Sequence, residues 1–237
     1  MSAEPAAGQF AQAEFDAYCD QYRQDHAASI RVSGEDVDFF AAYKARDARR
    51  LAAAAECRVE TMLDFGSGIG NAVGPLRDAF PDAALTCLDV SERSLDVSRR
   101  LHGDGPSYVA YDGQTLPFAD ASFDLVFTAC VFRHILESGH IALLAQLRRV
   151  LKPGGLFVLY EHNPWNPLTR HVVASCPFDA NAVLITAPEM KRRPRKGATV
   201  RTEYRVFFPK ALARLRPLER ALTARPLGGQ YVLGARP

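Results

Sequence analysis

The sequence has no hydrophobic run long enough for a membrane-spanning helix: none approaches the ~18 consecutive apolar residues that such a helix needs. Its first residues include Glu4, Glu14 and Asp16, and they lack the basic-then-apolar pattern of a secretory signal peptide. We therefore expect a cytoplasmic protein without a membrane span.

Cysteine is scarce and irregularly placed. The chain has five cysteines, no two of which form a Cys-x-x-Cys pair: Cys19, Cys57, Cys87, Cys130 and Cys176. An odd, widely spaced set argues against a disulfide framework and against a zinc site, so no metal is expected. Reduced, mostly buried thiols are the simplest interpretation.

The rest of the composition is that of a globular protein. Of 237 residues, 48% are hydrophobic and 24% are charged, which suits one α/β domain with a small helical appendage. Although the formal net charge is only +2, residues 191–225 contain twelve Lys and Arg against two Glu. This basic stretch is either a solvated surface or one that attracts an anionic small molecule. No nucleic-acid-binding module is recognisable, and no such partner is expected.

The hydrophobic pattern predicts N-terminal helices followed by alternating strands and helices. Aromatic residues at helical spacing favour helices over residues 9–30 and 35–56, and the strands are expected at residues 61–65, 84–90, 107–111, 122–129, 156–161, 200–208 and 230–234. Strands that alternate with helices form a parallel sheet covered on both faces. We thus predict a doubly wound, mostly parallel, seven-stranded α/β sheet, with an N-terminal helical cap (1–56) on a main domain (57–237).

Two serines mark expected helix starts. Ser33, with Glu35 and Asp36 after it, resembles a capping box, and Ser91 follows the second strand at an N-cap position. A further helix is expected over 141–151, before Pro153 and two glycines.

Glycines and polar residues follow the carboxyl ends of the predicted strands, where open α/β sheets bind ligands. The first strand ends in Asp64 and continues into Gly66-Ser67-Gly68-Ile69-Gly70, where the glycines allow a tight turn and close approach of a ligand. The second strand ends in Asp89, which is placed to accept hydrogen bonds from two ribose hydroxyls. The third and fourth strands end at Asp112 and Ala129.

A dinucleotide is the competing ligand for such a loop. Its Gly-x-Gly-x-x-Gly fingerprint fails here because the sixth position from Gly66 is Asn71. Asp64, directly before the loop, would also lie awkwardly beside a pyrophosphate. The same acid suits a ligand with an ammonium group and no phosphate, and S-adenosylmethionine (SAM) is such a ligand.

Over residues 60–162 the sequence resembles the class I SAM-dependent methyltransferases, most of all the small-molecule group that includes quinone-biosynthesis enzymes. The motifs that carry the resemblance are Leu63-Asp64-Phe65-Gly66-Ser67-Gly68-Ile69-Gly70-Asn71, Asp89, Asp112-Gly113, Leu116-Pro117-Phe118 with Ser122–Val126, and Leu147–Gly155. The resemblance implies SAM as the cofactor, with contacts from Asp64, Gly66, Ser67, Gly68, Asn71, Asp89, Val90, Asp112, Gly113 and Ala129.

The N-terminal cap is expected to close this site. Tyr18, Tyr22 and Tyr43 are similar to the aromatic lid of many relatives, with Tyr22 placed at the cofactor, and Lys44 is placed to reach the cofactor carboxylate. The same aromatic spacing also fits plain helix packing.

Candidate catalytic residues lie at the ends of the fourth and fifth strands: His134, Glu161 and His162. Relatives often have a His pair where this chain reads Arg133-His134, so His134 is either a base or a residue that positions the cofactor. Trp165, Asn166 and Arg170 are candidates for the wall of the acceptor site, with a core role for Trp165 as the alternative.

Nucleic-acid methylation is not indicated. The fourth strand leads into Thr128-Ala129-Cys130-Val131 rather than the Asn/Asp-Pro-Pro-Tyr of DNA and glutamine N-methyltransferases, and Cys176-Pro177 is interpreted as structural. Two functions stay open: methylation of a small-molecule acceptor on oxygen or nitrogen, or SAM binding in a non-methylating or regulatory role. The acceptor and the oligomeric state do not follow from the sequence.

Overall fold

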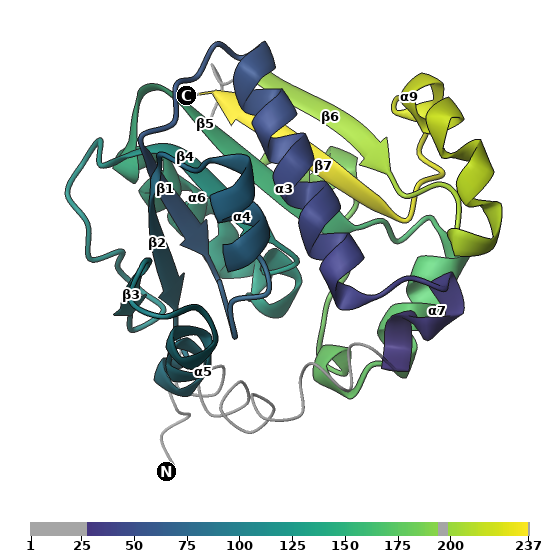
Figure 1. The fold of residues 1–237 in the computed structure, drawn as a ribbon, viewed down its shortest axis with the longest axis horizontal. Coiled ribbons are helices and arrows are strands. Elements are labelled where there is room, and N and C mark those ends of the chain that lie inside the picture. Colours follow the sequence, from purple (N-terminus) through teal and green to yellow (C-terminus); the bar gives the residue numbers. More distant parts are fainter. Residues whose placement is uncertain (1–27, 194–198, 237) are drawn as a thin grey trace.

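The computed structural model describes residues 28–193 and 199–236 (Figure 1). Within them, seven strands form one sheet in the order β3-β2-β1-β4-β5-β7-β6. The strands are β1 (Thr61–Phe65), β2 (Ala84–Asp89), β3 (Ser107–Ala110), β4 (Phe123–Ala129), β5 (Leu151–His162), β6 (Thr199–Arg205) and β7 (Gln230–Arg236). Strands β1 to β5 pair in parallel, whereas β7 is antiparallel to both of its neighbours. The predicted mostly parallel, seven-stranded sheet is confirmed.

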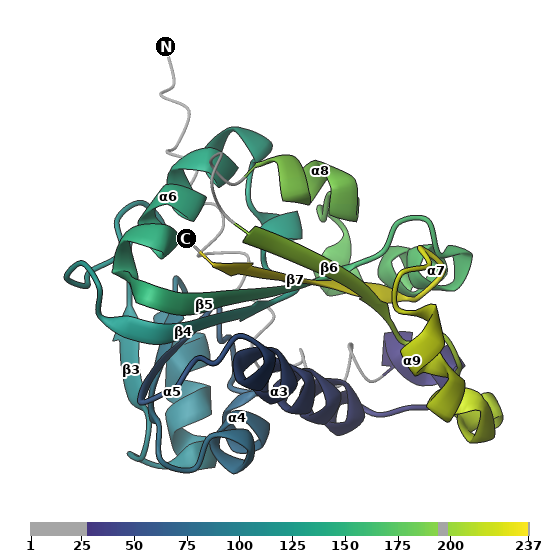
Figure 2. The same ribbon diagram turned by 90° about the horizontal axis from the view of Figure 1, so that it is seen from above.

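Helices cover both faces of the sheet (Figure 2). One face carries α3 (Val37–Ala54), α4 (Val73–Ala79) and α5 (Glu92–His102), and the other carries α6 (His140–Val150) and α8 (Ala187–Arg192). Because side chains alternate along a strand, Met62 packs into the cluster under α3 and α4, whereas Leu63 packs toward α6. The apolar strands are therefore buried on both sides, which confirms the doubly wound architecture.

The cap helix expected over 35–56 is α3, but its start differs from the prediction. Asp36 is the N-cap residue, and its side chain accepts a hydrogen bond from Phe39 N at 2.7 Å. Ser33 instead lies in a 3-10 turn, where its hydroxyl donates to Ile30 O. The capping-box prediction at Ser33 is wrong because Gly34, in a left-handed conformation, ends that turn first. Most of the helix expected over 9–30 lies outside the described residues.

Polar contacts fix α3 to the sheet. The hydroxyl of Tyr160 on β5 donates to Lys44 O at 3.1 Å, and Arg205 at the end of β6 donates to Asp47 at 2.9 Å. Ala48 and Leu51 of α3 are buried in the same hydrophobic cluster as α4. The described part of the cap is thus packed as one layer of the α/β fold, while the division at residue 56 stays a prediction.

The C-terminal region also differs in detail. Strand β6 ends at Arg205, three residues before the predicted end, because Val206 adopts a φ of +62° that interrupts an extended strand. Between the last two strands lie a 3-10 segment, η5 (Lys210–Leu218), and the short α9 (Glu219–Leu222). Both lie with α7 (Pro167–Ser175) beyond the carboxyl end of β5 (Figure 1). In the part of the chain described, no helix is long and apolar enough to cross a membrane.

Candidate active site

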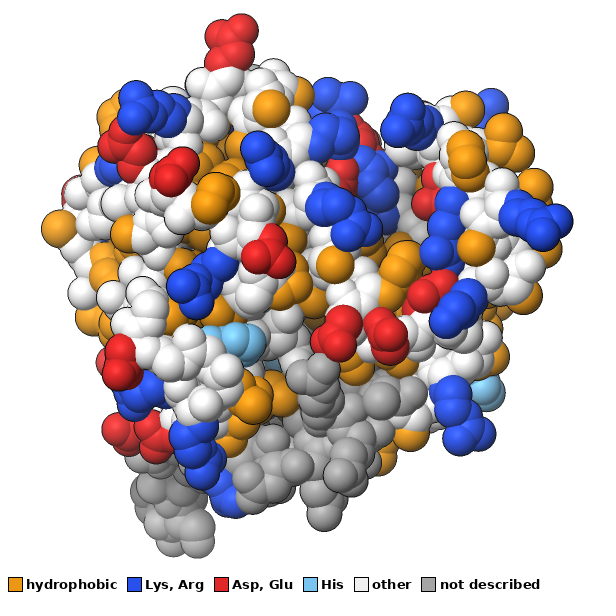
Figure 3. Space-filling view, viewed as in Figure 1, with side chains coloured by type: hydrophobic (Ala, Val, Ile, Leu, Met, Phe, Trp, Pro, Cys, Tyr) orange, Lys and Arg blue, Asp and Glu red, His pale blue; other side chains and the backbone are white. Residues whose placement is uncertain are grey.

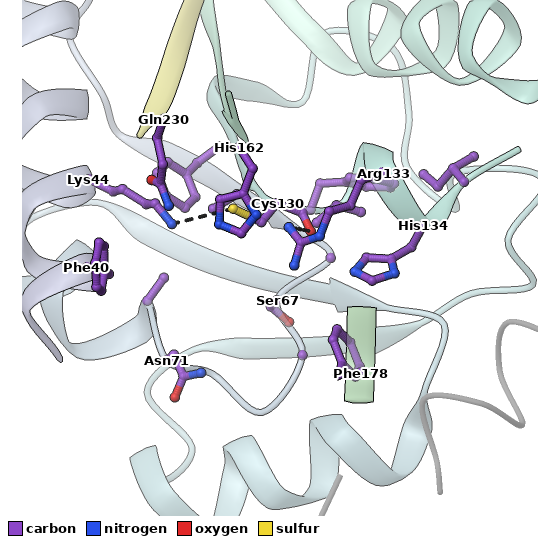
Figure 4. Close-up of a pocket in the computed structure, with 18 of the residues that line it drawn as sticks. Phe40, Lys44, Ser67, Asn71, Cys130, Arg133, His134, His162, Phe178 and Gln230 are labelled. Carbon is purple, nitrogen blue, oxygen red and sulfur yellow. Dashed lines mark hydrogen bonds between the residues drawn. The ribbon is translucent and has the colours of Figure 1, made fainter. Parts of the chain in front are cut away.

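A cavity of about 570 Å³ runs along the carboxyl edge of the sheet, a volume typical of small-ligand sites. The predicted cofactor-binding and catalytic residues that line it are Lys44, Asp64, Gly66, Ser67, Gly68, Asn71, Asp89, Val90, Gly113, Ala129, His134 and His162. Asp112 and Glu161 do not line it, and Tyr22 lies outside the described residues. Figure 4 shows Ser67 and Asn71 on one side of the cavity, with Lys44, His162 and Gln230 on the other.

The glycine loop folds back onto the second strand. Gly66 N and Ser67 N both donate to Leu88 O, at 2.8 and 3.1 Å, and Gly68 N donates to Asp89 Oδ2 at 2.8 Å. Gly66 has a φ of +73°, and a Cβ added there would clash with Val131. The loop therefore needs glycine at this position for its conformation and for its close contact with the end of β4.

Asp89 is fixed before any ligand binds. Its second oxygen, Oδ1, accepts from Ser91 N at 2.9 Å, so both carboxylate oxygens bind backbone N–H groups. A carboxylate oxygen has two lone pairs, so it can accept a second hydrogen bond. Because Asp89 lines the cavity, a ribose hydroxyl could supply that second hydrogen bond. Ser91 also caps α5 through Ser94 N, as predicted.

We expect Asp89→Ala to weaken SAM binding by ~2–4 kcal/mol, because charge-assisted hydrogen bonds are worth ~1.5–3 kcal/mol each and rarely add fully. The same change releases Gly68 N, so the loop loses its tether as well. Calorimetric titration with SAM measures the effect, with Asp96→Ala on the exposed side of α5 as the matched control. Unchanged affinity in a folded Asp89→Ala variant would show that the carboxylate does not contact the ribose.

Asp64 is the polar group that best fits a cationic ligand. The residue is 2% exposed, it lines the cavity, and its Oδ2 has no hydrogen-bond partner among the described residues. Burial, and then the charge of Asp89, raise the pKa of Asp64 to about 7. A buried acceptor of this kind is costly unless a donor reaches it, and the ammonium group of SAM is such a donor.

The loop after β3 contributes its backbone. Asp112 accepts from Gln114 N at 2.8 Å and from Thr115 N at 3.0 Å, which lowers its pKa and holds the loop from outside the cavity. Gly113 and Gln114 line the cavity instead, together with Gln146 of α6. Gln146 was not predicted from the sequence. Its side chain donates to Gln114 O and accepts from Leu116 N, and both partners lie 30 residues or more away in the chain.

Arg133 connects the ends of β4 and β5 to the 3-10 helix η4 (Pro177–Asp179). It donates to Asp179 Oδ1 at 2.9 Å and to Cys130 O at 2.7 Å, and lies 3.8 Å from Glu161 Oε2. Burial raises the pKa of Asp179, but Arg133 and the hydrogen bond with His134 outweigh it and hold that pKa below its usual value. His134 Nε2 lies 3.3 Å from Asp179 Oδ1. Asp179 could not be found from the sequence because it lies 46 residues away.

The two candidates on β5 face opposite sides of the sheet, because side chains alternate along a strand. His162 faces the cavity, and burial, followed by the charge of Arg133, lowers its pKa to about 3. Glu161 was expected to face the same crevice, but it is buried behind Arg133. Burial, and then Cys130, raise the pKa of Glu161 to about 7.

Of the described cap residues that were predicted at the site, Lys44 lines the cavity. Lys44 Nζ lies 3.7 Å from Cys130 Sγ at the cavity wall. Tyr43 does not line the cavity; its ring packs edge-on against Tyr160, and its hydroxyl donates to Gln230. Packing therefore explains Tyr43, while Tyr18 lies outside the described residues. Gln230, which pairs with His162 in the β5–β7 ladder and lines the cavity, gave no signal in the sequence.

The segment after β5 is only partly at the site. Asn166 lines the cavity, but Trp165 is 51% exposed and, like Arg170, lies outside the lining. Neither the wall role nor the core role fits Trp165. Cys176 is buried and outside the lining, as the structural interpretation of Cys176-Pro177 requires.

The basic stretch does not reach the cavity with any of its described cations. Arg193 binds Glu137, Arg205 binds Asp47, and Arg216 binds Glu35. Figure 3 shows other basic side chains at the surface of the η5–α9 segment, mixed with hydrophobic ones. These three arginines of the stretch thus serve in ion pairs that connect separate segments of the chain.

Comparisons with known proteins agree with this geometry. Residues 63–159 match the methyltransferase domain family. The chain is 30% identical over 149 residues to the fatty-acid O-methyltransferase of Mycolicibacterium smegmatis, covering 60% of this chain and 51% of that protein. It is 33% identical over 111 residues to the demethylmenaquinone methyltransferase of Thermotoga maritima, covering 47% of each. The chain spans about half the length of these curated relatives.

Solved structures share the whole fold at low sequence identity. A SAM-dependent methyltransferase of Thermotoga maritima, a possible histamine N-methyltransferase, has a TM-score of 0.62 at 16% identity and covers 95% of this chain and 99% of its own. DhpI, in complex with SAH, has a TM-score of 0.64 at 15% identity and covers 99% of this chain and 98% of its own. Residues 63–159 thus match the methyltransferase domain family, and the described chain shares the fold of SAM-dependent methyltransferases.

Proposed function

We propose that the protein transfers a methyl group from SAM to an oxygen atom of a small-molecule acceptor. The observation that carries the proposal is the pair of carboxylates at the glycine loop. Asp64 Oδ2 is buried with no hydrogen-bond partner among the described residues, and Asp89 is tethered to the loop. They supply acceptors for an ammonium group and for ribose hydroxyls in one cavity, and Lys44 at its wall suits the cofactor carboxylate. When bound, SAM supplies an activated methyl group, so the protein has mainly to align the acceptor.

Of the three catalytic candidates, His134 is the one suited to receive a proton. Asp179 lies at Nε2 and orients the ring, the arrangement by which a carboxylate stabilises a protonated imidazole. His162 is a poor base because its pKa lies at about 3, so its role is to hold the acceptor by hydrogen bonding. Glu161 lies behind Arg133 and contacts no acceptor in this scheme.

An anionic acceptor, suggested by the basic stretch, would need a cation at the cavity. Lys44 and Arg133 are the lysine and arginine residues among the described lining, and Arg133 already pairs with Asp179. With Lys44 assigned to the cofactor carboxylate, a neutral acceptor fits better than an anion. The cytoplasmic location and the lack of a nucleic-acid partner stay predictions.

Calorimetry and mass spectrometry test the proposal together. SAM and its demethylated product should bind and raise thermal stability by mass action, whereas NAD should not. Incubation with SAM and candidate acceptors should then yield the demethylated product and an acceptor heavier by one methyl group in place of hydrogen. Tight SAM binding with no transfer to any acceptor would favour the regulatory alternative, and NAD binding without SAM binding would overturn both.

His134→Asn should lower kcat by ~100-fold or more for a hydroxyl acceptor, because a positioned general base contributes ~10²–10⁴-fold. SAM affinity should stay unchanged. The matched control is His171→Asn, an exposed position on α7 outside the cavity lining. Equal kcat values for the two variants would show that His134 takes no part in proton removal.

A further inference from the structure

One side of the cavity is an apolar wall built from three separate parts of the chain. We define it as Ile30, Val37, Phe40, Val172 and Val206, which line the cavity and pack together as one cluster. They come from the cap, from α7 and from the residue after β6, whereas the glycine loop, Asp89 and Gly113 lie at β1, β2 and β3. Given the strand order, the apolar wall lies at the end of the cavity away from the ribose and adenine contacts.

The polar side chains beside the apolar wall already satisfy one another or the backbone. Ser33 donates to Ile30 O, Thr169 donates to Gly229 O at 2.8 Å, and Asn166 donates to Leu227 O at 2.8 Å. Asn166 also accepts from Thr169 N at 3.0 Å. These side chains line the cavity yet offer little to a ligand, so this end of the site is apolar in its chemistry as well as in its composition.

Two neutral groups stand where the apolar wall meets the ends of β5 and β7. His162 Nδ1 is buried without a partner, and the amide nitrogen of Gln230 makes no hydrogen bond within the described residues. The two residues face each other in the ladder. The acidic residues of the described lining are Asp64 and Asp89, both at the cofactor end. Hydrogen-bonding groups are thus available at this end, but no carboxylate is available for an ammonium group.

Resting on the proposed function, we infer that the acceptor is a hydroxyl compound with an extended apolar body, its body against the apolar wall and its hydroxyl at His162 and Gln230. An ammonium head group would lie beside His162 and Gln230 with no carboxylate to compensate its lost hydration. A carboxylate head group would compete with the cofactor carboxylate for Lys44 and with Asp179 for Arg133. The hydroxyl oxygen can accept one hydrogen bond from the Gln230 amide and one from His162, which leaves its proton for His134. Alkylphenols carry these features and serve as probes.

The test is calorimetric titration of 4-alkylphenols, from methyl to octyl, into the protein saturated with S-adenosylhomocysteine. Each added methylene contributes ~0.8 kcal/mol when buried, so Kd should fall about fourfold per carbon until the cavity is full. Alkanoates and alkylamines of equal length should bind at least ~10-fold more weakly at neutral pH. His162→Phe should reduce the preference for an alkylphenol over the matching alkylbenzene, because the hydroxyl then keeps only Gln230 as a partner.

A paired substitution on α3 provides the control. Ala41 lines the cavity and its neighbour Ala42 does not, while both are partly buried on the same helix. Ala41→Leu should weaken binding of the longest alkylphenols, with Kd rising about fourfold for each carbon of the alkyl chain that the leucine displaces. Binding of the shortest alkylphenols should stay unchanged. Ala42→Leu should leave the whole series unchanged.

Three outcomes would overturn the inference: affinity that does not depend on chain length, alkanoates or alkylamines that bind as tightly as phenols, or equal effects of the two leucine variants. The titration of S-adenosylhomocysteine itself reports separately on the proposed function. If it does not bind, the cofactor assignment fails, and the same alkylphenol series on the ligand-free protein still tests the apolar wall.

Discussion

Asp64→Asn should weaken SAM binding about 100-fold or more at pH 8, the largest effect expected of a single cofactor-site substitution. Asp64 Oδ2 is buried without a partner in the described residues, and the ammonium group of SAM would supply its donor. Removing one partner of a buried ion pair costs ~3–5 kcal/mol because the other charge stays uncompensated. Titration calorimetry measures the loss, and Asp82→Asn, on an exposed turn, is the matched control.

The pH dependence gives an independent test of the same carboxylate. With its pKa at about 7 in the free protein, Asp64 is largely protonated below pH 7, whereas the bound ammonium requires it ionised. SAM binding should therefore release a proton, and affinity should fall toward tenfold per pH unit from pH 7 to pH 5.5. Calorimetric titrations in buffers of different ionisation enthalpy measure the number of protons released per SAM bound. Asp64→Asn should abolish this release. If the SAM affinity of the parent protein did not change with pH, Asp64 would not be the partner of the ammonium group.

The stability of the ligand-free protein provides the folding control. Because the folded-state pKa of Asp64 is raised, the folded protein holds this proton more tightly than the unfolded chain. The contribution of Asp64 to the free energy of unfolding therefore falls as the pH rises from ~4, its pKa in the unfolded chain, through about 7, its pKa in the folded protein. Asp64→Asn removes that loss, so at pH 8 the ligand-free variant should unfold at a temperature no lower than that of the parent protein.

Arg133→Met should lower the free energy of unfolding by ~3–5 kcal/mol, because Asp179 would be left buried without its main partner. For a chain of this size the melting temperature should fall by ~6–20 °C. Arg148→Met, at an exposed site on α6, is the matched control. Adding Asp179→Asn to Arg133→Met should recover part of the loss, as coupled sites do not add. Equal melting temperatures for Arg133→Met and its control would show that the pair contributes no net stability.

The sequence alone determined the sheet and the strand-end residues that meet in the cavity. Both rest on local signals: apolar strands of fixed period, and glycines and acids directly after them. In a parallel sheet the carboxyl ends of strands meet at one edge, so residues such as Asp64 and Asp89 had to converge once the strands were placed. The position of Asp36, three residues beyond the expected cap, shows the usual limit at helix ends, where neighbouring polar residues compete for the same N–H groups.

Only the tertiary structure decided the acceptor half. The side of the sheet to which Glu161 points follows from the register of a strand that starts at Leu151, five residues before its predicted start. Asp179 and Gln230 reach the site through contacts 46 or more residues apart in the chain, and no local pattern marks them. Likewise the apolar wall exists only because α7 and Val206 pack on the cap. Strand ends converge by topology, whereas an acceptor site depends on the packing of segments whose sequences are independent of one another.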